Sequence, residues 1–143
     1  MTATLWLRIS SVIALLFAVG HTLGGLSDWS PMKDNPVIQA MWAVHFDIMG
    51  VNRSYLDFYK GFGHSLTVAQ VMQAVLLWQF ATLARTNAAA VRPMIGIMVL
   101  AGVVGSVIAW RFLVPVPALF SLVLVASLTV AFAVARRAPT LQP

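Results

Sequence analysis

Four apolar stretches of about 20 residues or more dominate the sequence, at residues 5–25, 59–83, 93–112 and 116–134. A helix of about 20 predominantly apolar residues is long enough to cross the hydrocarbon core of a bilayer. Of the 143 residues, 60% are hydrophobic and 9% charged, whereas about 25% of the residues of a soluble domain are charged. The sequence therefore predicts an all-α integral membrane protein, with one four-helix transmembrane bundle over residues 1–143.

The first connection of this bundle, residues 26–57, is long and polar. It opens with turn-forming and helix-breaking residues, which are Asp28, Pro31, Lys33, Asp34, Asn35 and Pro36. Apolar residues then recur at spacings of three or four, at Val37, Ile38, Met41, Trp42, Val44 and Ile48. This spacing predicts a short amphipathic helix that lies on the membrane surface or caps the bundle. We expect Gly50 to end it.

The third and fourth stretches are joined only by residues 113–117, so they are predicted to be antiparallel neighbours. Pro93 is expected in the first turn of the third helix. The first stretch lacks an A-x-A-like cleavage site, which favours a retained helix over a cleaved signal peptide. Small residues that allow close helix packing are Gly20, Gly24, Gly102, Gly105 and Ser106.

The charges suggest an orientation. With four spans, one side of the membrane holds Arg8, Arg85, Arg92, Arg136 and Arg137 and no acid. The other side holds Lys33, Arg53, Lys60 and Arg111 together with all four aspartates. The positive-inside rule then predicts an integral protein of the cell membrane with both termini in the cytoplasm and residues 26–57 outside. The side chains of Trp29, Trp42 and Trp110 are expected near the outer interface.

All three histidines fall toward this outer side, and histidine is the side chain best suited to proton transfer near neutral pH. If the second helix starts near Leu56, then Asp57, Lys60 and His64 share one helix face. The candidate catalytic residues are His21, His45, Asp47, Asp57 and His64. The candidate ligand-binding residues, which can hold an anionic group or donate a hydrogen bond, are Arg53, Tyr59, Lys60 and Arg111.

Other interpretations of these residues stay open. Loops and helix ends collect polar side chains simply because the membrane interior excludes them, and residues 52–54 also suit a turn and a helix cap. His21 is harder to explain in this way, because it lies in an apolar span. A haem bound by His21 and His64, or a metal bound by the histidines and an aspartate, is an alternative without a supporting motif. We therefore predict no metal site and leave the cofactor unknown.

Two classes of site are excluded by composition. The chain has no cysteine, so disulfides and thiolate metal sites are absent. The nine basic residues are scattered apart from the pair Arg136 and Arg137, despite the net charge of +5, and no longer basic run or aromatic platform for nucleic acid is present. The expected partners are the lipid bilayer, a lipophilic small molecule, and a second copy or another membrane protein.

Three segments, residues 20–25, 44–50 and 52–59, resemble those of a family of small bacterial four-helix integral membrane proteins. The resemblance covers most of the chain and implies a four-helix fold but no particular activity. The topology and the polar end of the first helix are also loosely similar to DoxX-like proteins. Sterol isomerases of the emopamil-binding type use carboxylates and histidine inside membrane helices; here no acid lies inside an expected span, and Asp57 lies only at the edge of one.

Two hypotheses about function follow. In the first, an outer-facing polar pocket binds a lipophilic small molecule, with His/Asp acid–base chemistry as a further possibility. In the second, the protein is a non-catalytic accessory or interaction subunit of a membrane complex. The pocket requires His21, His45 and His64 to approach one another, whereas the accessory subunit lets them scatter. The sequence does not decide whether the protein is an enzyme.

Overall fold

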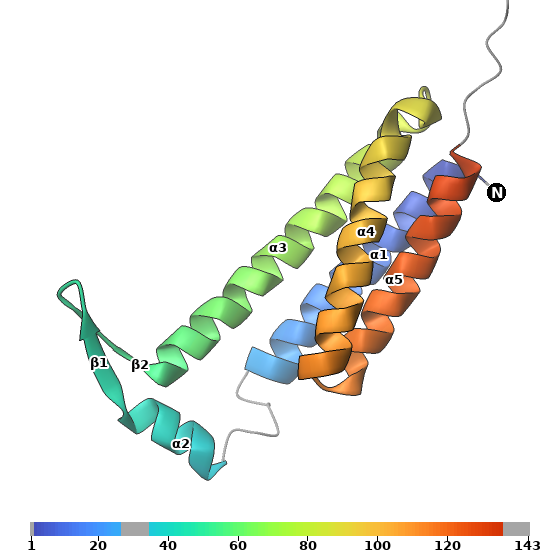
Figure 1. Cartoon of the computed structure of the whole chain (residues 1–143). Coiled ribbons are helices and arrows are strands. Elements are labelled where there is room, and N and C mark those ends of the chain that lie inside the picture. The colour runs from blue at the N-terminus through green and yellow to red at the C-terminus, as the bar shows by residue number, and fades with distance from the viewer. Residues whose placement is uncertain (1, 27–34, 136–143) are drawn as a thin grey trace, which may run out of the picture. The chain divides into compact units, whose positions relative to one another are not determined.

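A computed structural model describes residues 2–26 and 35–135 of the chain. The helices are α1 (Ala3–His21), the π-helix η1 (Thr22–Leu26), α2 (Pro36–Ala43), α3 (Tyr55–Leu83), α4 (Ala88–Phe112) and α5 (Pro115–Val134), and the strands are β1 (His45–Ile48) and β2 (Val51–Ser54) (Figure 1). Four helical segments, Ala3–Gly25 and helices α3, α4 and α5, are long and apolar enough to cross a membrane, which confirms the four predicted apolar helices. Predictions for Asp28, Trp29, Pro31, Lys33, Asp34, Arg136 and Arg137 lie outside the described residues.

The chain divides into two compact units. The first, which we call the helical unit, consists of residues 1–17 and 71–143, and so contains most of α1, the second half of α3, and α4 and α5. The second, the connection unit, consists of residues 18–70 and contains the end of α1, η1, α2, the two strands and the first half of α3.

The core of the helical unit is built from leucine, isoleucine and alanine on the inner faces of its four helices. Leu7, Leu77, Ile95 and Leu128 are fully buried. Around them lie the smaller buried side chains of Ala14, Ala74, Ala81, Val91 and Ala131. Most other large apolar residues of these helices are exposed, as expected where the surrounding solvent is lipid rather than water.

Buried serines link the helices of this unit. The Ser10 and Ser127 hydroxyls lie 2.8 Å apart, and Ser11 donates a hydrogen bond of 2.7 Å to the Ala74 carbonyl. Without a hydrophobic driving force between helices in lipid, close packing and interhelical hydrogen bonds of this kind hold a bundle together.

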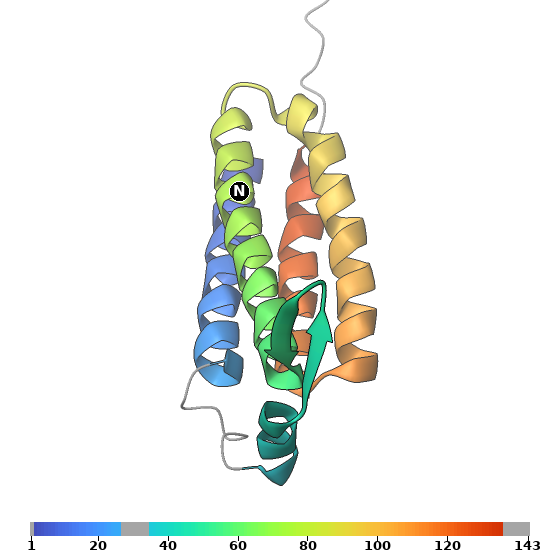
Figure 2. The same ribbon diagram turned by 90° about the vertical axis from the view of Figure 1, so that its left-hand side faces the viewer.

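Helices α4 and α5 run antiparallel and side by side, as predicted from their short connection (Figures 1 and 2). A Cβ atom added at Gly102 would lie 2.6 Å from Val125 Cγ2, so the predicted close approach at Gly102 is confirmed. Nothing lies within 4 Å of the corresponding position at Gly20, Gly24 or Gly105, so these glycines permit no such contact among the described residues.

The third membrane helix begins earlier than predicted. Helix α4 starts at Ala88, and the Asn87 side chain caps it by accepting a hydrogen bond of 3.1 Å from the Ala90 amide. Pro93 therefore lies inside the helix and not in its first turn, so that prediction is wrong. Alanine, which occurs three times between Asn87 and Pro93, is the strongest helix former. A prediction based only on the length of the apolar stretch therefore starts this helix too late.

In the connection unit, the predicted amphipathic helix is shorter than expected. Helix α2 is capped by Asn35, runs from Pro36 to Ala43 and has no buried residue. Residues 45–54 form an antiparallel hairpin instead, in which Ile48 pairs with Val51 (Figure 2). Met49 and Gly50 both have positive φ, 53° and 77°, which is the two-residue loop that matches the twist of a hairpin. Gly50 thus forms a turn and does not end a helix.

Candidate functional site

Polar contacts join the end of α1 to the first half of α3 within the connection unit. His21 Nε2 lies 3.2 Å from the Gly63 carbonyl oxygen, and Thr22 Oγ1 lies 2.9 Å from Thr67 Oγ1. Gln70 follows Thr67 by three residues and therefore lies on the same face of α3. We call these five residues the polar strip. They lie in segments otherwise apolar enough to cross a membrane, so their hydrogen bonds must be made within the protein or with a bound molecule.

The donor and acceptor roles of the two threonine hydroxyls in the strip follow from the number of protons available. Thr22 Oγ1 is 2.9 Å from the Ala18 carbonyl and 2.9 Å from Thr67 Oγ1, while Thr67 Oγ1 is also 3.3 Å from the Gly63 carbonyl. Each hydroxyl has one proton and carbonyls only accept, so two of these three contacts can form together. The two shorter ones are compatible: Thr22 donates to Ala18, and Thr67 donates to Thr22. The Gly63 carbonyl is then left to His21.

The same argument identifies the ring nitrogen of His21 that donates to Gly63. A carbonyl oxygen has no proton to give, so the hydrogen bond to Gly63 requires that His21 Nε2 carries the proton. In the neutral ring the other nitrogen, Nδ1, then holds a lone pair. No described residue donates a hydrogen bond to Nδ1. With respect to the described residues, the half-buried ring therefore presents an open acceptor inside a segment apolar enough to cross a membrane.

A second acceptor without a partner belongs to Gln70. Its side chain is 7% exposed, and its Oε1 atom is buried with no hydrogen-bond partner among the described residues. An unsatisfied buried amide oxygen costs about 1–3 kcal/mol, so such groups are rare and call for an explanation. Both groups of the strip that lack a partner among the described residues are acceptors, and the chemically complementary group is a hydrogen-bond donor.

The backbone at the end of α1 is itself unusual. The chain passes from α-helix into a π-helix at Thr22, and the π-helix continues to Leu26 through Gly24 and Gly25. Isolated π-helical turns are uncommon and occur often at functional sites, because the extra residue redirects the side chains around it. Here the change of helix type falls directly after His21, in the middle of the polar strip.

The strip on α3 differs from the face predicted from sequence. The predicted face contained Asp57, Lys60 and His64, but it is Gly63 and Thr67 that contact α1. His64 is exposed. One residue corresponds to a rotation of about 100° around a helix, so His64 is turned by that angle from the face that meets His21.

The predicted catalytic aspartates are engaged elsewhere. Asp47 Oδ1 accepts a hydrogen bond of 2.9 Å from Asn52 across the hairpin. Asp57 Oδ2 accepts from the Ser54 amide at 2.8 Å and from the Ser54 hydroxyl at 2.9 Å, while the Asp57 amide donates back to Ser54 Oγ at 3.1 Å. This reciprocal pattern is a capping box at the start of α3. Neither carboxylate bonds to a histidine in the described part of the chain.

Replacing Ser54 with alanine is therefore expected to destabilise the start of α3. Ser54 is completely buried, and its hydroxyl both accepts from the Asp57 amide and donates to Asp57 Oδ2, so the loss of this hydroxyl should cost about 0.5–2 kcal/mol. Hydrogen exchange at the amides of residues 56–58 measures this, with Ser65→Ala as the matched control, since Ser65 is exposed and bonds only to Gly61 within its own helix. Equal protection in the two variants would contradict the cap.

The other predicted site residues do not gather at the strip. The exposed His45 bonds through Nδ1 to the Ala43 carbonyl at 3.2 Å, and Arg53 Nη1 donates to the adjacent Asn52 carbonyl at 2.9 Å. Tyr59 is 39% exposed, and Lys60 is exposed. Arg111 belongs to the helical unit, with its guanidinium carbon 5.3 Å from the Phe112 ring centroid. No group of three or more His or Asp side chains in residues 2–26 and 35–135 is placed to bind a metal ion.

An aromatic cluster next to the hairpin was not predicted. The Phe46 ring centroid lies 5.1 Å from those of both Tyr55 and Phe58, and Phe58 lies 6.0 Å from Phe62. The spacing of Tyr55, Phe58 and Phe62 by three and four residues is a sequence signal for one helix face. The cluster fixes β1 against the first two turns of α3.

No family model, curated protein or solved structure matches this chain. Its resemblance to small bacterial four-helix membrane proteins therefore stays a prediction, and the case for function depends on the geometry of the polar strip.

Proposed function

We propose that this protein binds a lipophilic molecule whose polar head donates a hydrogen bond to Nδ1 of His21. The observation that carries the proposal is the His21–Gly63 hydrogen bond of 3.2 Å, because it directs the ring proton to Nε2 and leaves Nδ1 as an acceptor. The unpartnered Gln70 oxygen offers a second acceptor farther along the same face of α3. A hydroxyl, amide or ammonium group has the complementary chemistry.

The surroundings of the strip favour a lipophilic molecule over a water-soluble one. Apolar side chains next to it in sequence are exposed, among them Val19 at 49%, Phe62 at 72% and Leu66 at 45%. In a bilayer these side chains face hydrocarbon, and a molecule that reaches His21 along them must itself be soluble in hydrocarbon. Its head group gains more from a hydrogen bond there than in water, since the alternative is an unsatisfied polar group.

The contacts favour binding over acid–base catalysis. A catalytic histidine is usually oriented by a carboxylate, but His21 is held by a backbone carbonyl. The Asp47 and Asp57 carboxylates bond to Asn52 and Ser54. His21 on its own has the proton acceptor that a general base needs, so proton transfer to its Nδ1 is the one catalytic step that this arrangement supports.

A His21→Gln variant tests the proposal. Glutamine can still donate to the Gly63 carbonyl through Nε2, but its acceptor oxygen Oε1 is attached one bond farther from the backbone than the ring nitrogen Nδ1. The helix contact should therefore survive, while the acceptor is displaced from the bound head group and binding is weakened. The protein is purified from membranes in mild detergent, and copurifying lipophiles are measured by native mass spectrometry and by solvent extraction. We expect a stoichiometric molecule in the unmodified protein, at least tenfold less in His21→Gln, and no change in His64→Ala, which removes an exposed histidine one residue from Gly63. The absence of any bound lipophile, or equal loss in both variants, would contradict the proposal.

We further propose that the strip opens toward the outside of the bacterial inner membrane, with both termini cytoplasmic. The support is the charge distribution, because Arg8, Arg85 and Arg92 share the side of the termini without any acid. Accessibility of single cysteines introduced at Thr86 and at Met49 to a membrane-impermeant reagent tests this in intact cells. Labelling of Met49→Cys alone is the expected result, and labelling of Thr86→Cys alone would reverse the orientation.

The alternative function, an accessory or interaction subunit, is favoured by the hairpin tip. Met49 is 98% exposed, and its neighbours Ile48 and Val51 are 54% and 44% exposed. An apolar tip outside the spans is suited to a membrane-protein partner or a second copy of the chain. Ile48→Asp separates the two functions: it should leave a lipophile bound at His21 but dissociate a complex formed through the tip, as measured by size-exclusion chromatography.

A further inference from the structure

Arg8 is a cation of the helical unit with a buried N–H group that has no partner among the described residues. It is half-buried in α1, and its Nε atom is buried without a hydrogen-bond partner among the described residues. Its guanidinium carbon lies 5.0 Å from the ring centroid of Trp78 on α3, which is a cation–π contact. This contact leaves all the N–H groups of the guanidinium without an oxygen acceptor in the described structure.

The helical unit has no acid that can pair with Arg8. Residues 1–17 and 71–143 contain neither aspartate nor glutamate, and the four aspartates of the chain all lie between residues 28 and 57. A cation in an apolar environment is costly unless it is paired and hydrogen-bonded. No side chain of this unit can therefore supply an anion that pairs with Arg8.

Arg92 shows how an arginine of the same unit is satisfied internally. Its Nε donates to the Phe132 carbonyl at 3.3 Å, and its guanidinium carbon lies 4.2 Å from the Phe132 ring centroid. Arg8 has the ring but not the oxygen. The difference between the two arginines is thus one missing acceptor.

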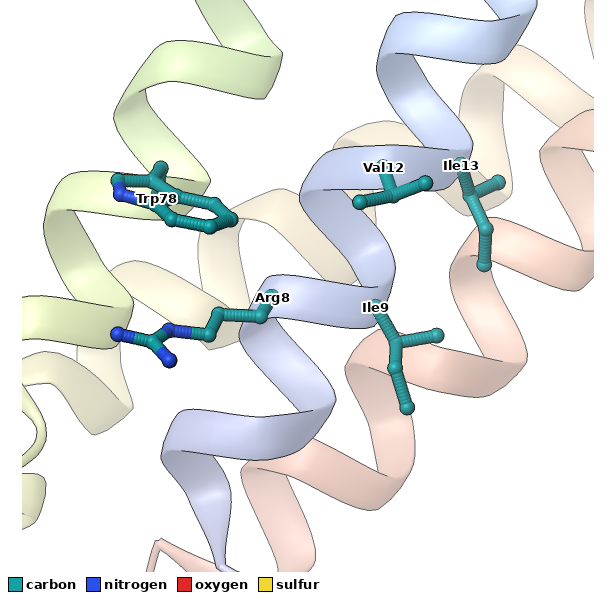
Figure 3. A pocket seen from close by; sticks show the side chains of 5 residues that line it. All are labelled: Arg8, Ile9, Val12, Ile13 and Trp78. Atoms are coloured by element: carbon teal, nitrogen blue, oxygen red, sulfur yellow. The ribbon is translucent and has the colours of Figure 1, made fainter.

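An apolar groove lies beside the unpaired cation. It has a volume of about 300 Å³, and its lining residues are Arg8, Ile9, Val12, Ile13 and Trp78 (Figure 3). In Figure 3 the Arg8 side chain reaches from α1 along the indole of Trp78, while the other three side chains follow α1 away from it. The groove therefore has one charged end and an otherwise aliphatic wall.

Arg8 lies at a distance from the end of its helix that corresponds to the lipid head-group region. Arg8 lies five residues from Ala3, where α1 begins, and Trp78 lies five residues from Leu83, where α3 ends. At 1.5 Å per residue both are about 7.5 Å from the ends of their helices. Arginine and tryptophan side chains in this position favour the boundary between head groups and acyl chains.

We propose that the groove binds an anionic phospholipid, whose phosphate accepts hydrogen bonds from the Arg8 guanidinium and whose acyl chain lies along Ile9, Val12 and Ile13. The guanidinium fork matches a phosphate oxygen pair and supplies the missing acceptor. Inorganic phosphate would satisfy the cation but would leave the aliphatic wall unused. The combination of one cation and an apolar groove is complementary to a lipid that carries both a negative charge and a chain.

Native mass spectrometry of the full-length protein, titrated with dioleoyl phosphatidylglycerol or with dioleoyl phosphatidylcholine, tests the proposal. The two lipids have the same chains, but only the first carries a net negative charge. We expect phosphatidylglycerol to bind at least tenfold more tightly than phosphatidylcholine, and Arg8→Gln to remove this preference. Arg85→Gln is the matched control, because it removes the same charge from an exposed position in the same unit, and it should change the affinity by less than twofold.

A second variant tests the groove without removing the charge. Val12 is 49% exposed, so Val12→Phe fills the groove while the surface stays apolar and the fold is preserved. It should weaken phosphatidylglycerol binding at least fivefold. Competition by millimolar inorganic phosphate should be absent. Equal losses in Arg8→Gln and Arg85→Gln, displacement of the lipid by phosphate, or dissociation of an oligomer by Arg8→Gln in place of lipid loss would each overturn the proposal.

Discussion

Replacing Gly102 with leucine is expected to lower the free energy of unfolding by about 3 kcal/mol, the upper part of the range for overpacked sites. Even a Cβ atom at this position would lie 2.6 Å from Val125 Cγ2, so α4 and α5 have to move apart or Val125 has to leave its rotamer. Valine is branched at Cβ and adapts poorly. Titration with sodium dodecyl sulfate, followed by circular dichroism, measures the loss.

The neighbouring glycine provides a control in the same helix. Nothing lies within 4 Å of a Cβ atom added at Gly105, so Gly105→Leu should be neutral within about 0.5 kcal/mol. The milder Gly102→Ala should be rescued by Val125→Ala, since the second change removes the atom that the new Cβ meets. If Gly102→Leu and Gly105→Leu are equally stable, then the packing of α4 on α5 described here is incorrect.

The second large effect is expected at Phe46. Its ring makes two edge-to-face contacts, each with centroids 5.1 Å apart, to Tyr55 and Phe58. Each aromatic pair contributes about 0.5–1.5 kcal/mol beyond the area it buries, and an isolated two-stranded hairpin is only marginally stable. Phe46→Ala should therefore open the hairpin, and we expect amide hydrogen exchange in residues 45–54 to become at least tenfold faster.

Phe62→Ala is the control for this prediction. Phe62 contacts Phe58 at the far end of the cluster, with centroids 6.0 Å apart, and makes no aromatic contact with the hairpin among the described residues. Its loss should therefore leave exchange in the strands within about twofold of the unmodified protein. Exchange that is unchanged in Phe46→Ala would show that the hairpin is held by something other than this cluster.

The membrane-spanning helices were predictable because their signal is additive. Each depends on the summed hydropathy of about 20 residues, so single polar residues such as Arg8 or His21 do not obscure it. The helix boundaries were less predictable, since they depend on individual caps. The Asn87 cap of α4 and the Ser54–Asp57 cap of α3 each start a helix before its apolar run begins.

The hairpin was not predicted because its apolar residues satisfy two periodicities. Val44 and Ile48 are four residues apart, which fits a helix, but a separation of four also fits one face of a strand. The deciding feature is the Met49–Gly50 turn. Methionine seldom adopts positive φ, so this pair lacks the Asn-Gly signature that normally identifies such a loop.

Of the polar strip, only His21 was among the predicted site residues, and the α3 residues that it meets were not predicted. His21 was singled out because an ionisable group is costly in an apolar span, and it is the histidine that the structure places in an interhelical contact. Which residues of α3 it meets depends on how that helix is rotated, and a rotation of one residue, about 100°, exchanges Gly63 for His64. No local pattern in a single sequence specifies this rotation.

The central claim, that His21 presents an open acceptor at Nδ1, is tested most directly by nitrogen NMR of the histidine rings in ¹⁵N-labelled protein at neutral pH. We predict that the His21 resonance, assigned by its absence in His21→Gln, reports a proton fixed on Nε2 and none on Nδ1, and that the Nδ1 signal shifts when copurifying lipophile is removed. A proton on Nδ1, or fast exchange between the two tautomers of His21, would contradict this claim.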